Sequence, residues 1–273
     1  MFQTRSQLGI FGAAGRLAAL IYHNTVRTVR KSHGNALMAL ATNIFQTVLM
    51  VGVFYLMFSI LGLRGMAIRG DFLLYIMSGI FLYMTHIKAL SAVVGSEGPA
   101  SPMMQHLPMT TTVAVASAAL GALYIQVLSM LVVLYVYHVV WNPIEIYQPV
   151  WAFAMVLSSW FSGLAIGMIF LALKPWMPGF TQIVTQIWQR ANMFASGKMF
   201  VANALPAYML AMFDWNPLIH TIDQARGFIF INYNPHFSSV SYPIYVSLAC
   251  LVIGFMGEAH TRRHASVSWN AKR

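Results

Sequence analysis

Three ionisable residues, His220, Asp223 and Arg226, follow one another at intervals of three. In a helix, side chains at i and i+3 lie on one face, so this spacing predicts that Asp223 pairs with Arg226. Asn216 and Pro217 precede them, an order typical of a helix cap followed by a first turn. We therefore predict a fixed, charge-paired break in the chain. Direct ligand contact or gating by the charged pair is the alternative role.

Two further charges, Lys88 and Arg190, lie inside long apolar stretches. A charge at membrane depth is costly unless it has a partner or faces water, so such a residue is a candidate for function. Lys88 could instead extend toward the membrane surface or pair with Glu97, and Arg190 could make a structural contact near a helix end. The functional alternative is that both line a hydrated path.

The motifs of several enzyme classes are absent from the sequence. The fragment Gly197-Lys198-Met199 lacks the upstream glycine and the hydroxyl residue of a phosphate-binding loop. There is no H-E-x-x-H or G-x-S-x-G motif, and Cys250 is the single cysteine. Of the nine histidines, five have no ligand-like spacing to one another: His86, His106, His138, His220 and His236. The six acidic residues are scattered, so a proton or sodium relay lacks its usual carriers. We expect no catalytic residue, metal or cofactor in this chain, and an energy source outside it.

The elements that position these residues are predicted from hydrophobicity. The chain is 59% hydrophobic and 8% charged, too little charge to cover a water-facing globule of 273 residues. About 20 apolar residues cross the membrane core as a helix. The sequence predicts an all-α integral membrane protein with six spanning helices, near residues 36–62, 72–95, 109–140, 150–173, 179–196 and 241–258.

Basic residues at both ends of the chain indicate its orientation. Residues 1–35 carry five Lys or Arg and no acid, and the tail 259–273 adds four. By the positive-inside rule both ends are cytoplasmic, and the net charge of +10 is a topology signal, not a nucleic-acid footprint. Within the first segment, a set of basic residues lies within about 60° on a helical wheel, which predicts an amphipathic helix at the membrane surface. These residues are Arg16, His23, Arg27 and Arg30.

Two stretches interrupt the transmembrane domain, residues 36–258. The connector 96–108 is rich in helix breakers and could present a compact element to a soluble partner. The segment 197–240 mixes apolar patches with Pro206, Pro217 and Pro235, which favours short broken helices that re-enter the membrane surface.

This arrangement, with the run Asn216-Pro217-Leu218-Ile219-His220-Thr221-Ile222-Asp223-Gln224-Ala225-Arg226, resembles the permease subunit of type-2 ABC exporters. Within them it is most similar to the group that exports capsular polysaccharide in Gram-negative bacteria. The resemblance covers nearly the whole chain, and the run matches the family pattern N-P-[LI]-x-[HP]-x-[IL]-[ED]-x-x-R, with Asp223 where glutamate is usual.

The resemblance implies a homodimer in the bacterial inner membrane that moves a lipid-linked polysaccharide. A separate cytoplasmic ATPase would bind ATP and magnesium, and periplasmic and outer-membrane proteins would receive the polymer. Residues 197–240 would form a periplasmic gate, with Asn216, Pro217, His220, Asp223 and Arg226 as its motif. The connector would be the element that couples to the ATPase, through Glu97, Pro99, Pro102, His106, Leu107 and Pro108.

Aromatic residues in or beside the spans could make weak, repeated contacts with a sliding sugar polymer, although lipid contact and core packing also use them. Our candidates for the translocation path are Tyr83, Lys88, Trp160 and Arg190.

Three alternatives remain open at this stage. An exporter of O-antigen, teichoic acid or a small hydrophobic compound would share the same architecture. A polytopic transferase acting on a lipid-linked substrate would need clustered acids or histidines at one membrane face. A channel or secondary carrier would work without an ATPase.

Overall fold

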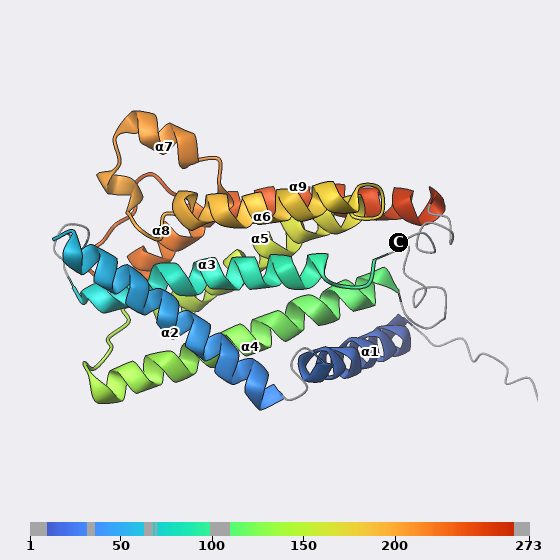
Figure 1. Cartoon of the computed structure of the whole chain (residues 1–273), viewed down its shortest axis with the longest axis horizontal. Coiled ribbons are helices and arrows are strands. Elements are labelled where there is room, and N and C mark those ends of the chain that lie inside the picture. The colour runs from blue at the N-terminus through green and yellow to red at the C-terminus, as the bar shows by residue number, and fades with distance from the viewer. Residues whose placement is uncertain (1–9, 32–35, 63–67, 69, 99–109, 265–273) are drawn as a thin grey trace, which may run out of the picture.

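The computed structural model describes residues 10–31, 36–62, 68, 70–98 and 110–264 (Figure 1). All regular structure in these ranges is helical. The long helices are α1 (Ile10–Lys31), α2 (Ala36–Ile60), α3 (Phe72–Val94), α4 (Thr111–Val140), α5 (Pro149–Leu173), α6 (Pro178–Ala195) and α9 (Ser241–His264). Between α6 and α9 lie the 3₁₀ turn η2 (Ala202–Ala204), α7 (Ala207–Phe213) and α8 (Pro217–Ile229).

Five helices, α2, α3, α4, α5 and α9, are long and apolar enough to cross a membrane. They correspond to five of the predicted spans, although α9 continues to His264, past the predicted end at residue 258. The sixth predicted span, 179–196, forms the 18-residue helix α6. This helix is too polar to count with the five, because it carries glutamines, threonines and Arg190.

Three helices of the bundle, α3, α5 and α9, run in the same direction. On α3 and α5, Leu82 bonds to Ser159, and four residues further along His86 lies against Gly163. A Cβ added to Gly163 would lie 2.3 Å from the His86 carbonyl oxygen, so only glycine allows this approach. Small residues at a helix contact are the usual way in which membrane helices pack closely. α5 and α9 are likewise parallel, because Gly254 packs against Met168 and Thr261 bonds to Ala172.

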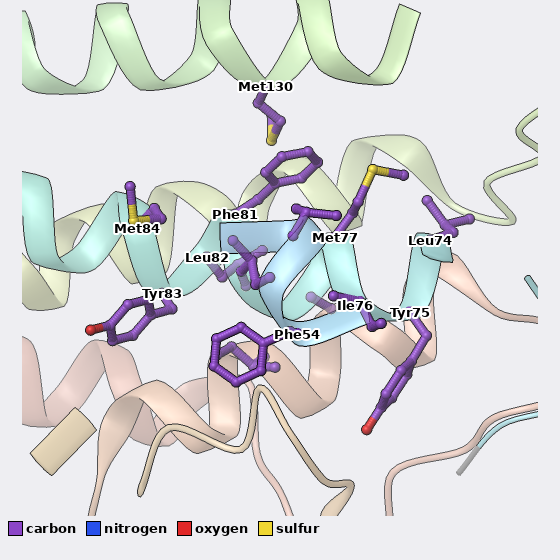
Figure 2. Packing of buried hydrophobic residues seen from close by; sticks show 14 of the residues in the cluster. Phe54, Leu74, Tyr75, Ile76, Met77, Phe81, Leu82, Tyr83, Met84 and Met130 are labelled. Atoms are coloured by element: carbon purple, nitrogen blue, oxygen red, sulfur yellow. The ribbon is translucent and has the colours of Figure 1, made fainter. Parts of the chain in front are cut away.

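α3 is the most enclosed of these helices, and it holds the largest apolar cluster together. Figure 2 shows Phe81 pointing from α3 toward Met130 of α4, whereas Tyr75 and Tyr83 point to the opposite side. Phe54 of α2 packs on that opposite side as well. The side of α3 that carries the two tyrosines therefore faces α2 and the segment after α6.

The two ends of the bundle differ. α1, the end of α3, the start of α4 and the end of α9 lie together at one end, which we call the α1 end (Figure 1). α7 and α8 lie at the other, the α8 end. The segment 197–240 contains the predicted short helices, joined by turns, and its re-entry into the membrane surface stays a prediction. α1 packs on α4, with Ile21 bonded to Ser117 and Val29 beside Gly121, and its Arg16 and Arg27 are exposed.

Candidate functional site

The predicted motif forms the buried helix α8. Asn216 is its N-cap, accepting a hydrogen bond from the Leu218 N–H at 3.1 Å, and Pro217 occupies the first turn, as the sequence predicts. The Asn216 amide also donates to Asn192 Oδ1 at 2.8 Å and to the Ala195 carbonyl at 3.0 Å, both on α6. The cap therefore fixes the start of α8 to the end of α6.

Arg226 is fully buried, although it is the largest cationic side chain of the motif. Its Nη1 donates to the carbonyls of Gly197 at 2.7 Å and Phe200 at 2.6 Å, and its Nη2 donates to the Lys198 carbonyl at 2.7 Å. The guanidinium lies 4.1 Å from the centre of the Tyr75 ring, a cation–π distance. Arg226 thus holds the turn after α6 against α3.

Two glycines make this approach possible. Gly197 has a φ of 77°, a conformation that side-chain-bearing residues rarely adopt. A Cβ on Gly79 of α3 would lie 2.9 Å from Arg226 Nη2 and from the Lys198 Cα. The turn and the guanidinium therefore occupy the space that a side chain at position 79 would need.

Asp223 binds the other end of the same segment. Its Oδ1 accepts from the Ala202 N–H at 3.2 Å and from the Tyr233 hydroxyl at 2.5 Å, and its Oδ2 accepts from the Ser238 hydroxyl at 2.7 Å. Burial, followed by the nearby Asp223 carboxylate, raises the pKa of the Tyr233 hydroxyl, so that this group stays a donor. Asp223 therefore joins the segment before α8, at Ala202, to the segment after it, at Tyr233 and Ser238.

The predicted ion pair between Asp223 and Arg226 is wrong. Within the described part of the chain, the one close contact between an acid and an ionisable nitrogen is His220 Nε2 to Asp214 Oδ1, at 3.3 Å, and it is an ion pair only when the imidazole is protonated. Arg226 instead donates from its two Nη atoms to carbonyls of segment 197–202, and Asp223 accepts from the Ala202 N–H and from two hydroxyls. The physical reason is that the buried carbonyls and N–H of this segment need partners, and the two side chains provide them.

His220 has a separate role on α8. Its Nε2 donates to the Asp214 carbonyl at 2.7 Å, and its Nδ1 accepts from the Ser239 N–H at 3.1 Å. Its ring lies 4.5 Å from that of Tyr242, measured between centroids. His220 consequently ties the turn before α8 to the start of α9.

Lys198 is a functional candidate that sequence reasoning treated only as part of a failed phosphate-loop motif. It is 3% exposed, and its ammonium lies over the rings of Tyr83 at 3.8 Å and Phe54 at 4.5 Å with no hydrogen-bond partner. Burial lowers the pKa of this ammonium to about 7, although the two ring faces favour the charged form. The local sequence held no signal for this, because the aromatic partners come from α2 and α3.

A second candidate site lies between α3 and α6. The Tyr83 hydroxyl donates to the Gln189 carbonyl at 3.2 Å, and the Gln189 amide donates to the Ser91 hydroxyl at 2.9 Å. Toward the α1 end the two helices diverge around a cavity of about 440 Å³, which we call the α3–α6 cavity. Its lining is largely polar or small: Ser91, Val94, Gly95, Lys174, Pro178, Gly179, Thr181, Gln182, Thr185 and Gln186.

The path candidates are only partly brought together. Tyr83 contacts α6 through the Gln189 carbonyl. Arg190 is exposed on one face of α6 together with Gln182 and Gln186. The contact that Lys88 makes is to Gln46 Oε1 of α2, at 2.5 Å. Trp160 lies apart, because its indole donates to the Ala119 carbonyl of α4 at 2.8 Å.

The connector residues fall mostly outside the described part of the chain. This applies to Pro99, Pro102, His106, Leu107 and Pro108, so their role in coupling stays a prediction. Glu97 is described and lies partly exposed after the end of α3.

A buried hydrogen-bond chain links α6 to the core, and sequence reasoning missed it. The indole of Trp188 donates to His86 Nε2 at 3.2 Å. His86 must therefore carry its proton on Nδ1, which donates to Ser162 at 2.8 Å, and Ser162 donates to the Ser159 carbonyl at 2.8 Å. The spacing of His86 from the other histidines does not reveal these partners, because they lie on α5 and α6.

No protein-family model matches this sequence, and no curated protein matches it. The resemblance to type-2 ABC permeases therefore depends on the residues quoted for it. Among the described residues, no group of three or more His, Cys, Asp or Glu is placed to hold a metal ion.

Proposed function

We propose that this chain is the permease subunit of an ATP-driven exporter, and that two copies enclose a polysaccharide path. The observation that carries the proposal is the polar stripe on α6, formed by Gln182, Gln186 and Arg190. These residues are spaced by four, so they share one face of the helix, and all three are exposed. Lipid tails cannot satisfy such groups. The stripe is expected to face water or a second copy of the chain.

The course of α6 supports a sixth crossing of the membrane. α6 runs antiparallel to α3, because Gln189 lies at Tyr83 while Pro178 lies near Gly95. The turn after α6 then reaches Gly79. Since α5 and α9 run in the same direction, α6 has to return the chain to the α8 end. A helix that follows α3 over this distance crosses a layer of about 25 Å or more.

The α3–α6 cavity supports passage of a glycan. Amides and hydroxyls line it together with Lys174, and none of its lining residues is acidic. The Gln182 and Gln186 amides of this lining can form hydrogen bonds with sugar hydroxyls, and the absence of an acid from the lining means that it does not repel an acidic polymer. A lipid-linked capsular polysaccharide in the bacterial inner membrane fits this chemistry and the family pattern at 216–226.

Energy would come from a cytoplasmic ATPase that docks at the α1 end. The predicted coupling connector, 96–108, joins α3 to α4 at this end, and the exposed Arg16 and Arg27 of α1 lie there too. Positive charge at one end of the bundle favours the cytoplasmic side. Both termini would then be cytoplasmic, and α7 and α8 would lie on the periplasmic side.

The test is purification of the tagged full chain from its own cells, followed by measurement of magnesium-dependent ATP hydrolysis. We expect a second subunit to co-purify with ATPase activity, and a Gly/Ser replacement of residues 99–108 to abolish the association. A Gly/Ser replacement of residues 143–146, at the α8 end, is the matched control and should retain it. Transport or catalysis by the chain without any companion subunit overturns the proposal.

The path itself is tested on α6. Gln186→Leu combined with Arg190→Leu should lower polymer export in cells by about tenfold while the protein level is unchanged. Ile187→Ala is the control, because Ile187 is 59% exposed on the same helix but belongs to its apolar face. If the α6 stripe faced lipid, the leucines would raise stability and leave export unaltered.

A further inference from the structure

A cavity of about 330 Å³ lies between four helices near the α1 end, and we call it the four-helix cavity. It has no part in the contacts of α8. Its residues come from the last turn of α1, the first part of α2, the last part of α3 and the first half of α4. They are Thr28, Val29, Ala39, Thr42, Asn43, Gln46, Lys88, Ser91, Ala92, Ala118, Gly121, Ala122 and Ile125.

The charge of this cavity is positive. Lys88 is the one charged residue of its lining, and no carboxylate accompanies it there. The Lys88 ammonium donates one hydrogen bond, to Gln46 Oε1 at 2.5 Å, which leaves two of its three protons for a ligand. Thr42 of α2 and Ser91 of α3 add hydroxyl groups to the lining. This donor set fits an anion such as a phosphate ester.

The polar side of the cavity is backed by a buried network. Asn43 Nδ2 donates to Gln126 Oε1 at 3.0 Å and to Ser129 Oγ at 2.9 Å. Gln126 is 1% exposed, and its Nε2 has no partner in the described part of the chain. A buried amide donor without an acceptor is unfavourable, and because Gln126 lies behind the lining residues, an ordered water is the group that would satisfy it.

The position and the other walls of the cavity indicate an amphiphile. Lys88 stands seven residues before Gly95, about 10 Å along the helix from the end of α3. That depth corresponds to the boundary between headgroups and acyl chains of a membrane leaflet. Val29, Ile125 and four alanines supply apolar walls, and the volume accommodates a headgroup with the first part of its chains but no polymer.

We propose that the four-helix cavity binds the phosphate of an anionic lipid from the adjacent leaflet, with Lys88 as its charge partner. The exposed Arg16 and Arg27 of α1, at the same end, would raise the local concentration of such lipids. The inference rests on α1 to α4 and holds whether or not the chain exports a polymer. A membrane phospholipid and a soluble phosphate ester share the required chemistry, and the test separates them.

The test uses the purified full chain, together with any subunit that co-purifies, in a neutral detergent. Binding of phosphatidylglycerol, phosphatidylcholine and glycerol 1-phosphate is measured by native mass spectrometry and by the shift in thermal unfolding temperature. We expect phosphatidylglycerol to bind and to stabilise, and the other two to have little effect. Equal binding of phosphatidylcholine overturns the role of charge, and equal binding of glycerol 1-phosphate overturns the lipid.

Three variants localise the binding. Lys88→Gln should weaken phosphatidylglycerol binding by about tenfold or more, because a charge-assisted bond is lost. Ala122→Phe should also abolish it by filling the cavity without changing the charge. Arg263→Gln removes one exposed cation at the end of α9 and should leave binding intact. Unchanged binding in Lys88→Gln, or an equal loss in Arg263→Gln, overturns the proposal.

Discussion

Asp223 and Arg226 stand one turn apart on α8, yet they bind opposite ends of segment 197–202 and not each other. Arg226 donates to three carbonyls near the start of the segment, and Asp223 accepts from the N–H of Ala202. The two charges therefore act as a clamp on the chain after α6.

Replacement of Arg226 by methionine should strongly destabilise the protein. Three carbonyls of segment 197–200 would lose their donors. We expect a loss of about 3–5 kcal/mol in the free energy of unfolding. Unfolding of the purified protein in mixed detergent, followed by circular dichroism, measures it.

A charge exchange separates the clamp from an ion pair. In Asp223→Arg with Arg226→Asp, a direct pair would be restored and stability would recover. Because each side chain binds its own backbone groups, we expect the exchange variant to be at least as unstable as Arg226→Met. Recovery to near wild-type stability would show that the pairing predicted from the i, i+3 spacing holds after all.

Lys198 should make stability depend on pH. Its folded pKa of about 7 lies below the value of an unfolded lysine, about 10.4, so the unfolded chain binds more protons between these values. Stability should therefore rise as the pH increases from about 7 toward 10, by at most about 1.4 kcal/mol per pH unit from this group.

The comparison variant is Lys198→Met, which keeps the length of the side chain and removes the buried ammonium. It should be more stable than the wild type at pH 7, and this difference should shrink as the pH is raised to 9.5. Thermal unfolding of both proteins across this range gives the result. A constant difference would mean that Lys198 does not titrate between folded and unfolded states.

Gly163→Ala tests the close packing of α3 on α5. The added methyl group would meet the His86 carbonyl at 2.3 Å, and backbone cannot move aside as a flexible side chain can. We expect a loss of about 2 kcal/mol or more. Gly52→Ala on α2 is the control, because nothing lies within 4 Å of its Cβ, and helix propensity should make it neutral or stabilising by up to about 1 kcal/mol.

His86→Phe should loosen α6 from the core. The change leaves the Trp188 indole and the Ser162 hydroxyl without their partner, at a loss of about 1–3 kcal/mol. Hydrogen exchange should become faster along α6 and stay unchanged in α9. Adding Trp188→Phe should cost little more, because both changes break the same chain of hydrogen bonds. Full additivity would contradict the linkage.

Part of this architecture could be predicted because its causes are local. The N-cap at Asn216 with Pro217 in the first turn depends only on neighbouring backbone groups, and the structure confirms it. The pairing of Asp223 with Arg226 was also predicted from local spacing, and it was wrong. Segment 197–202 supplies the groups that bind both side chains. It can lie against α8 because Gly79, far from the motif in the sequence, has no side chain, and because Gly197 adopts a positive φ.

Sequence alone determined the helical, membrane-embedded character of the protein, because the length and apolarity of a segment decide whether it can cross a lipid layer. It also located the residues that carry charge within these segments. Only the tertiary structure decided what those charges bind. Lys88 meets a glutamine of α2, and Arg190 stays exposed in the polar stripe of α6. Lys198, which lies outside the predicted spans, meets rings of α2 and α3. The reason is physical: the partner of a buried polar group is chosen by which helices pack together, and that choice involves residues distant in the chain.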